Sequence, residues 1–438
     1  MTSAKLKELY KEKGKYVILA VITALLFFSN LWEPLWIIAS VVLVALYATC
    51  SISEMFCFTM YFELFSSWDL FFVVNLLIAF VSLTVRYIID VKKKQKEVFV
   101  LPLVLSFVIT IVFGVIHYEV NLDGFSKGGL FVAMLFVFYY VFIYHKEISL
   151  DNCFRFLTLG MIVSSVLGVA SLLIDSPLRS IIYIDSVGYK RLQLYSFHTN
   201  FLALLCLFNV AFYVYKMVNS KGKIWESVIC IAISTVLGIL TLSKAFLLLF
   251  AAIAVYFVVF LIVKYKKHSW KFVVPIVVVA VALVAVFHEF IGNIIQRFLA
   301  YDTGSIISKL TTGRTRIWSQ YVESARSSVL KMLFGVGLFT KDLIAIGPHN
   351  VLLFLLYRIG VVGIILMCVL GYSYFKCSKT KLKITLKNCL PILLWIVISL
   401  EEMILSERFT YFLLFAIILL IQEKNQKEQI ETNDIKQN

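Results

Sequence analysis

Arg314 and Arg316 stand two residues apart at the predicted start of a short helix, two and four residues after Thr312, the predicted N-cap. The backbone N–H groups at a helix start attract anions, and a guanidinium group pairs with phosphate in a bidentate way. The two arginines therefore predict a phosphate-binding site. Arginines that only reach toward lipid head groups would give the same pattern.

The residues after Arg316 predict how this helix is held. The apolar side chains that recur at helical spacing on one face are Ile317, Trp318, Tyr321, Val322 and Ala325. Polar side chains, among them Glu323, occupy the other face. We therefore expect an amphipathic helix that lies on the membrane surface.

A histidine stands farther along the chain, in the sequence Gly347-Pro348-His349-Asn350, before a hydrophobic stretch. Imidazole is the side chain best suited to move protons near neutral pH. We predict that His349 orients or deprotonates a hydroxyl group and that Asn350 helps to orient it. A structural histidine at the membrane interface is the alternative.

Three more polar residues stand beside predicted turns. Lys244 follows a sharp turn between two apolar runs, where it could bind a diphosphate or only reach toward lipid head groups. Arg191 and His198 precede another apolar run. Residues so far apart in sequence can form one site only if the apolar runs bring them together.

The apolar runs fill most of the chain. Of its 438 residues, 61% are hydrophobic and 15% are charged, whereas a soluble domain is about 45–50% apolar and about 25% charged. Most runs have about 17–22 residues, which suits helices that cross a bilayer and argues against the alternating strands of a membrane barrel. The predicted spans are 16–32, 34–52, 69–90, 98–117, 129–145, 156–175, 199–217, 224–241, 244–263, 272–288, 360–375, 389–403 and 409–422. The sequence thus predicts an all-α, polytopic transmembrane protein with about 12–14 membrane segments in a single domain over residues 1–438.

The net charge of +15 is distributed as in a membrane protein. The lysine clusters between apolar runs lie at 5–15, 92–96, 264–271 and 376–387. Clusters of this kind mark cytoplasmic loops, so we expect both termini in the cytoplasm. No basic domain stands apart from the membrane, which argues against nucleic-acid binding. Successive loops alternate between the cytoplasmic and the outer face. This alternation places a smaller loop, 176–198, and a large loop with short helices, 289–349, on the outer face.

The alternation leaves one question open near the N-terminus. An even number of crossings must separate the N-terminus from Lys92 if both are cytoplasmic, but only three strong apolar runs lie between them. Either the weak segment 54–67 crosses the membrane as well, or one early run is re-entrant.

The two outer loops are net basic and carry no metal-ligand pattern. Lipid head groups would explain the basic charge, and so would an anionic ligand such as a phosphate-bearing lipid. No Cys-x-x-Cys, Cys/His or acidic cluster has the spacing of a metal site. The sequence therefore predicts neither a metal nor a cofactor.

Taken together, these segments resemble the O-antigen ligase and polymerase superfamily of integral membrane glycosyltransferases. The similarity covers about residues 190–375 and rests on the order and spacing of several pieces. The closest are GRTRIW (313–318), FGVGLF (334–339) and PHNVLLFLLYRIGVVGIILM (348–367), followed by LSKAFLLL (242–249) and FHTNFLA (197–203). Three positions depart from the family pattern: Lys244 replaces the usual arginine, Thr199 a common proline, and Arg358 a frequent acidic residue.

The resemblance implies a reaction. Members of the family transfer a glycan from a polyprenyl diphosphate carrier to an acceptor hydroxyl on the outer face, without a nucleotide sugar or a metal. The implied catalytic residues are His349 and Arg314. The implied substrate-binding residues are Arg316, Lys244, Arg191, Asn350 and His198.

The resemblance also implies partners and a location. The partners would be an undecaprenyl-diphosphate-linked oligosaccharide, membrane lipid and other polysaccharide-assembly proteins, and the location would be the bacterial plasma membrane. A polymerase must hold two anionic carriers. The two basic outer loops therefore fit a polymerase better than they fit a ligase. The sequence thus favours a repeat-unit polymerase for capsule, O-antigen or exopolysaccharide. A ligase, a polysaccharide flippase or transporter, and a non-catalytic scaffold are the alternatives.

Overall fold

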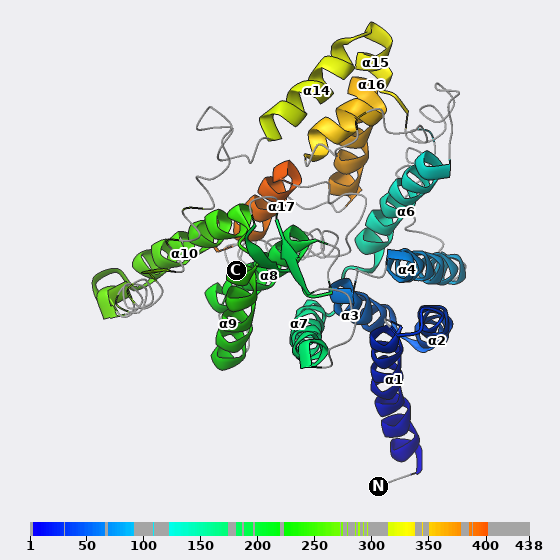
Figure 1. Cartoon of the computed structure of the whole chain (residues 1–438), viewed down its shortest axis with the longest axis vertical. Coiled ribbons are helices and arrows are strands. Elements are labelled where there is room, and N and C mark those ends of the chain that lie inside the picture. Colours follow the sequence, from blue (N-terminus) through cyan, green and yellow to red (C-terminus); the bar gives the residue numbers. More distant parts are fainter. Residues whose placement is uncertain are drawn as a thin grey trace, which may run out of the picture.

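The computed structural model is mostly helical, with one small β-hairpin (Figure 1). The ranges that it describes are 3–29, 31–65, 69–91, 122–173, 181–185, 188–195, 198–219, 223–271, 314–337, 350–377, 385–387 and 389–401, with isolated positions at 108, 344 and between 273 and 296. The predicted spans 98–117, 272–288 and 409–422 lie outside these ranges, apart from isolated positions.

The helices follow the apolar runs of the sequence. Those before the hairpin are α1 (Ser3–Phe28), α2 (Leu35–Thr49), α3 (Ile52–Phe62) with the 3-10 turn η1 (Glu63–Phe65), α4 (Asp69–Val91), α6 (Leu122–Tyr144) and α7 (Leu150–Leu173). The hairpin consists of β1 (Ile182–Ile184) and β2 (Lys190–Leu192). Those after it are α8 (Thr199–Val218), α9 (Ile224–Leu240), α10 (Lys244–Tyr265) with the 3-10 turn η2 (Lys266–His268), α14 (Arg314–Arg326), α15 (Val329–Phe334), α16 (Val351–Cys377) and α17 (Cys389–Glu401).

Several helices have the length and composition of membrane spans. Five described segments qualify on both counts, and they are Val73–Asp90, Leu150–Ser171, Thr199–Val218, Lys244–His268 and Val351–Val369. The shorter apolar helices α2 and α9 do not reach that length. The structure therefore confirms a mostly helical chain with helices that can cross a membrane.

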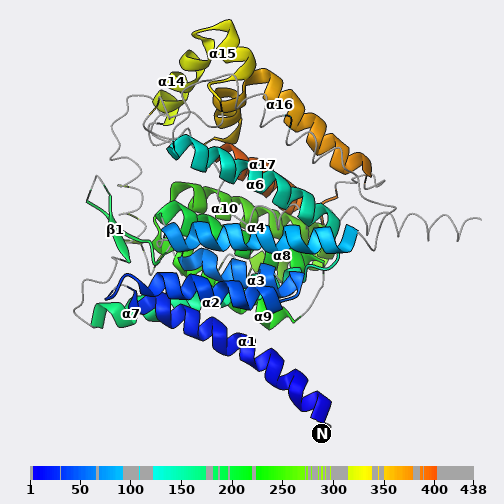
Figure 2. The ribbon, with the colours of Figure 1, turned by 90° about the vertical axis from the view of Figure 1, so that its right-hand side faces the viewer.

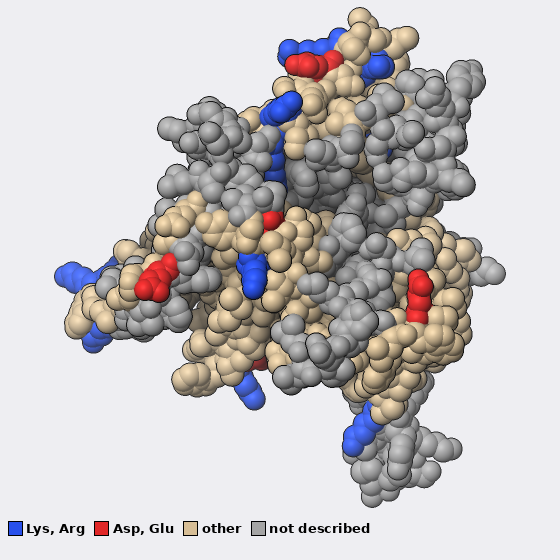
Figure 3. Space-filling view, viewed as in Figure 1, with Lys and Arg blue, Asp and Glu red and all other residues tan. Residues whose placement is uncertain are grey.

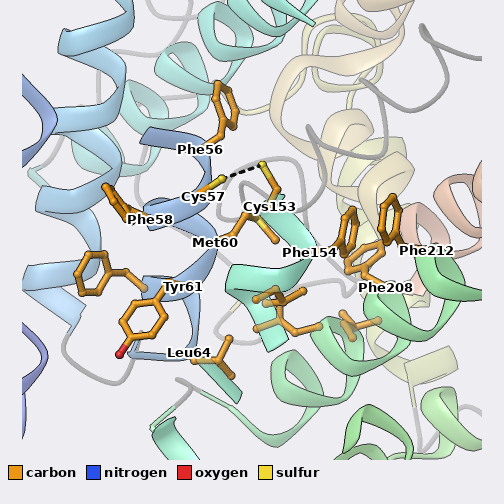
Figure 4. Close-up of a cluster of buried hydrophobic side chains, with 14 of the residues drawn as sticks. Phe56, Cys57, Phe58, Met60, Tyr61, Leu64, Cys153, Phe154, Phe208 and Phe212 are labelled. Atoms are coloured by element: carbon orange, nitrogen blue, oxygen red, sulfur yellow. Dashed lines mark hydrogen bonds between the residues drawn. The ribbon is translucent and has the colours of Figure 1, made fainter. Parts of the chain in front are cut away.

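The core of the bundle lies where α3, α7 and α8 meet. The Phe154 ring of α7 stacks on the Phe212 ring of α8, with centroids 4.0 Å apart, and Figure 4 shows both rings within a cluster of buried aromatic and aliphatic side chains. A Cβ on Gly160 of α7 would lie only 2.8 Å from the Tyr61 carbonyl oxygen of α3. Glycine at this position therefore allows α3 and α7 to pack closely.

Polar contacts link several helices at one end of the bundle, which we call the Lys15 end. Lys15 of α1 forms an ion pair with Glu54 of α3 at 2.7 Å. The Ser149 amide, just before α7, donates to the Ser53 hydroxyl at 2.9 Å. Lys15, Glu54 and Ser149 therefore lie at the same end.

Charged residues at the starts and ends of α7, α8 and α9 meet at the Lys15 end as well. The ammonium group of Lys216 lies 3.4 Å from Asp151 and 3.7 Å from Glu226. The Asn219 amide group donates to the Lys387 carbonyl at 3.1 Å. Lys387 of the predicted lysine cluster 376–387 thus shares one end of the bundle with the start of α7, the end of α8 and the start of α9.

The hairpin lies at the opposite end from the N-terminus (Figure 2). Its strands are antiparallel, with Tyr183 opposite Arg191. The sequence predicted only a loop here, because strands of three residues carry too little alternation to be recognised. The hairpin is an addition to the predicted all-α fold.

The weak segment 54–67 runs lengthwise inside the bundle. It forms most of α3 and η1, whose first residues lie at the Lys15 end. Its last residue in the structure, Phe65, stacks on Tyr195 beside the hairpin, with ring centroids 6.2 Å apart. Nearly every residue of α3 is buried by protein, which explains why the segment is shorter and more polar than a lipid-facing span.

Candidate functional site

Arg191 joins three elements at the hairpin end. Its side chain is buried, with 6% of its surface exposed. Its Nε donates to the Thr241 carbonyl at 2.8 Å, and its Nη2 donates to the Asn200 side-chain oxygen at 3.0 Å. The guanidinium group therefore ties β2 to the start of α8 and to the turn between α9 and α10.

Lys244 begins α10 directly after that turn. Leu242 takes a positive φ of 51°, and the Ser243 hydroxyl accepts from the Phe246 amide as the N-cap of α10. Lys244 is also buried, with 8% exposed. Two cations that are nearly out of water thus lie at one corner of the fold, and the Asp185 carboxylate of the hairpin is buried as well, with 7% exposed.

His198 is the N-cap of α8 at the same corner. Its Nδ1 accepts a hydrogen bond from the Asn200 amide at 3.2 Å. A neutral imidazole that accepts at Nδ1 carries its proton at Nε2, so the second ring nitrogen is a donor. We call Arg191, His198, Asn200, Thr241 and Lys244 the hairpin corner. It brings together three of the residues that the sequence singled out.

The helix α14 carries Arg314 and Arg316, and its apolar face is as predicted. Tyr321 and Ala325 are buried, while Arg316 is exposed. The Tyr321 ring packs edge-on against Tyr357 of α16, with centroids 4.9 Å apart. The apolar face thus packs on α16, a protein surface, where the sequence predicted the membrane. The predicted N-cap Thr312 lies outside the described residues.

The start of α14 and the start of α16 lie at the same level. Figure 1 shows α14 and the first part of α16 side by side and running in the same direction. Tyr321 and Tyr357, which touch, come seven residues after Arg314 and Asn350, respectively. Seven residues rise about 10 Å in a helix, so Arg314 and Asn350 lie at matching heights. The two helix starts also align the positive ends of two helix dipoles.

Asn350 has a structural role at the start of α16. Its side-chain oxygen accepts from the Leu353 amide at 3.0 Å, which makes it the N-cap of α16. The predicted catalytic residue His349 precedes it directly and lies outside the described residues. The structure therefore places Arg314, Arg316 and Asn350 on two packed helices, and it leaves the position of His349 as a prediction.

Both signs of charge gather on the exposed side of α14. Figure 3 shows cationic and anionic side chains close together over α14 and α15, at the top of the view. Arg316, Glu323 and Arg326 are the exposed charged residues of α14. These three residues together are net basic, but they do not form a continuous basic patch.

The sequence offered no account of Arg358, and the structure supplies one. The helix α16 is broken at Gly360, which has a φ of 63°. Arg358 lies just before the break with 2% of its surface exposed, and its Nη1 donates to the Gly337 carbonyl at 3.3 Å. An arginine inside an apolar run, two residues before a glycine, was the signal that could have pointed to this break.

The described residues contain no group of three His, Cys, Asp or Glu side chains that could hold a metal ion. Comparisons with known protein families, with curated proteins and with solved structures gave no match. Any function must therefore be argued from the residues and their arrangement.

Proposed function

We propose that this chain is an integral membrane glycosyltransferase of the bacterial plasma membrane. It would polymerise oligosaccharide repeat units of a capsule, O-antigen or exopolysaccharide that are carried on undecaprenyl diphosphate. One observation carries the proposal: the candidate basic residues gather at one end of the bundle, away from the N-terminus, as Figure 2 shows for the hairpin and α14. A diphosphate carrier embedded in one leaflet needs its anion-binding groups at one membrane surface.

The proposed reaction uses side chains alone. Arg314 and Arg316, at the start of α14, hold the donor diphosphate and stabilise the charge that develops as it leaves. The acceptor hydroxyl oxygen forms a bond to the anomeric carbon while the bond from that carbon to the phosphate oxygen breaks. The electron pair departs with the diphosphate, and the hydroxyl proton passes to His349.

A polymerase fits the two basic groups better than a ligase. Donor and acceptor both carry a lipid diphosphate in a polymerase, so two anion sites are needed. The hairpin corner, with Arg191 and Lys244 buried, supplies the second site in addition to Arg314 and Arg316. His198, with its Nε2 donor, belongs to the substrate-binding residues of that corner.

We also propose a topology with both termini in the cytoplasm. The helices α1, α2, α3 with η1, and α4 would then all cross, which gives the even number of crossings that Lys92 requires. The ion pair between Lys15 and Glu54 and the stacking of Phe65 on Tyr195 support this count. The Lys15 end would face the cytoplasm, and the hairpin corner would face the outside.

The test is polymer formation in a cell that lacks this protein. Complementation with the wild type should restore long chains, whereas His349→Ala and Arg314→Ala should leave single repeat units. Loss of one preorganised donor or proton acceptor lowers a rate by about 10²–10⁴-fold, which suffices for this phenotype. Arg326→Ala, at the exposed end of the same helix, is the matched control and should behave like the wild type.

All variants must reach the membrane at equal levels for this comparison. Long chains made by both His349→Ala and Arg314→Ala would overturn the proposal. Long chains joined to a different acceptor in the wild type would identify a ligase.

A transporter of lipid-linked glycans is the second candidate, because one observation favours it. The break of α16 at Gly360, with the buried Arg358 beside it, resembles the discontinuous helices that line transport sites. The two functions differ in where single repeat units accumulate when the protein is missing. A missing polymerase leaves them on the outer face, whereas a missing transporter leaves them on the cytoplasmic face.

A further inference from the structure

We infer that Arg358 is a positioning residue: it fixes the turn after α15 onto the first part of α16 and so holds Arg314 level with Asn350. The inference rests on the proposed function for its catalytic consequence. The contact itself involves Gly335, Val336, Gly337, Tyr357, Arg358 and Gly360, which we call the α15–α16 junction.

The break at Gly360 creates the need for this junction. In a continuous helix the carbonyls of Tyr357 and Arg358 would accept from residues one turn later. Here the Val336 amide donates to the Tyr357 carbonyl at 2.8 Å, and the Gly337 amide donates to the Arg358 carbonyl at 2.9 Å. The turn after α15 thus replaces the helix bonds that the break removes, which an apolar environment demands.

Two glycines permit the backbones to approach this closely. A Cβ on Gly335 would lie 2.4 Å from the Arg358 carbonyl carbon, and a Cβ on Gly360 would lie 2.4 Å from the Leu333 carbonyl carbon. Both glycines also have positive φ angles, 73° and 63°. The contact is therefore backbone against backbone, and no other residue fits at either position.

Arg358 closes the junction with its side chain. Its Nη1 donates to the Gly337 carbonyl while its own carbonyl accepts from the Gly337 amide, so the two residues exchange hydrogen bonds. The guanidinium carbon lies 6.0 Å from the Phe354 ring centroid and 5.7 Å from that of Tyr357. Two aromatic faces and a carbonyl stabilise the cation out of water. A lysine retains the charge and has N–H donors but lacks the planar fork.

The junction determines where α14 lies on α16. The Tyr357 carbonyl accepts from Val336, and the Tyr357 ring packs on Tyr321 in the middle of α14. A loosened junction lets α14 shift along α16, which moves Arg314 relative to Asn350. The diphosphate can still bind to Arg314 and Arg316, but the donor no longer meets the acceptor in the reactive geometry.

The test compares Arg358→Met, Arg358→Lys and the control Lys216→Met in the purified full-length protein. Lys216 is a cation with the same 2% exposure, but it lies at the Lys15 end. Hydrogen exchange of peptides that contain Val336 and Gly337 should become at least about tenfold faster in Arg358→Met, because their acceptors are released. The increase should be smaller in Arg358→Lys and absent in Lys216→Met.

The catalytic readout is the dependence of the polymerisation rate on donor concentration. Arg358→Met should lower kcat by about 10–100-fold with little change in donor KM, and Arg358→Lys should recover part of the loss. Unchanged exchange at Val336 and Gly337, or a raised KM with an unchanged kcat, would overturn the inference. If Arg358→Met does not accumulate, Arg358→Lys carries the same test.

The proposed function and the positioning role of Arg358 can be refuted independently of each other. A wild-type protein that polymerises nothing removes the proposed function, while faster exchange at Val336 and Gly337 in the variants would still establish the junction. An active wild type with unchanged exchange in the variants removes the positioning role alone.

Discussion

The two ring nitrogens of His198 separate its role in the fold from the role in substrate binding that we propose for it. Nδ1 caps α8 by accepting from the Asn200 amide, while Nε2 carries the proton. The imidazole is half-buried and lies 5.9 Å from the Tyr183 ring of the hairpin, measured between ring centroids. The structural role of this residue and its proposed role in substrate binding can therefore be separated by substitution.

His198→Asn should retain the fold and reduce substrate binding. Asparagine is among the best N-cap residues, so the free energy of unfolding should stay within about 0.5 kcal/mol of the wild type. It lacks a donor in the place of Nε2, so the KM for the lipid-linked donor or acceptor should rise. His198→Ala removes both functions and should also destabilise the protein by about 1 kcal/mol.

Thermal unfolding in detergent and polymerisation kinetics provide the two measurements. A wild-type KM in His198→Asn would show that the histidine acts only as a cap. Equal loss of stability in both variants would show that asparagine cannot replace the imidazole at this cap.

The helices around the hairpin corner pack so closely that one methyl group should disturb them. A Cβ on Gly238 of α9 would lie 2.2 Å from the Phe246 ring of α10. That ring is buried and also stacks on Phe250, with centroids 5.6 Å apart. The Gly238 position therefore determines how near α10 and its first residue, Lys244, lie to α9.

Gly238→Ala should lower the free energy of unfolding by about 1–3 kcal/mol, because the Phe246 ring must move. The matched control is Gly129→Ala in α6, where a Cβ would have no neighbour within 4 Å. Alanine there should be neutral or stabilise the protein by up to about 1 kcal/mol, since it favours the helix. Melting temperatures of both variants in one detergent test this difference, and equal values would contradict the close packing.

The sequence predicted the long elements well and the irregular ones poorly. Apolar runs at helical length indicated α8 and α10 to within two residues, because burial in lipid or protein requires them, whereas α7 begins six residues before its predicted span. The segment of α3 was ambiguous because protein surrounds it, which permits polar residues such as Thr59 inside. Periodicity also missed the first part of α16, since the break at Gly360 separates two apolar runs.

The candidate site could be predicted as residue types but only partly as an arrangement. Arg191, His198 and Lys244 were chosen separately, and only the fold shows that they meet. Their link is the carbonyl of Thr241 and the side chain of Asn200, and neither contact has a signature in the sequence. The role of Arg358 was missed for the same reason, because its partner Gly337 is 21 residues away.

The whole molecule has two ends that the proposed function assigns to opposite sides of the membrane. At the Lys15 end, cations pair with carboxylates: Lys15 with Glu54, and Lys216 with Asp151 and Glu226. At the hairpin end, Arg191 bonds neutral oxygens of Thr241 and Asn200. The proposed function places the carrier diphosphate at the hairpin corner, so it requires the hairpin end to face the outer leaflet.

Labelling from the two sides of the membrane tests this requirement. The native cysteines are first replaced, and single cysteines are introduced as Lys190→Cys on the hairpin and Lys387→Cys beside α17, both at exposed positions. We expect a membrane-impermeant maleimide to label Lys190→Cys in intact cells or spheroplasts. Lys387→Cys, whose carbonyl lies at the Lys15 end, should react only after permeabilisation.

Equal labelling of both variants after permeabilisation shows that both thiols are accessible, so a difference in intact cells reports the side of the membrane. The reverse pattern would place Arg191, His198 and Lys244 in the cytoplasm. A carrier-linked glycan on the outer face could not reach them there, so the polymerase proposal would fail. Labelling of both thiols in intact cells would contradict the bundle itself, because the two ends are separated by the length of α8, about 30 Å.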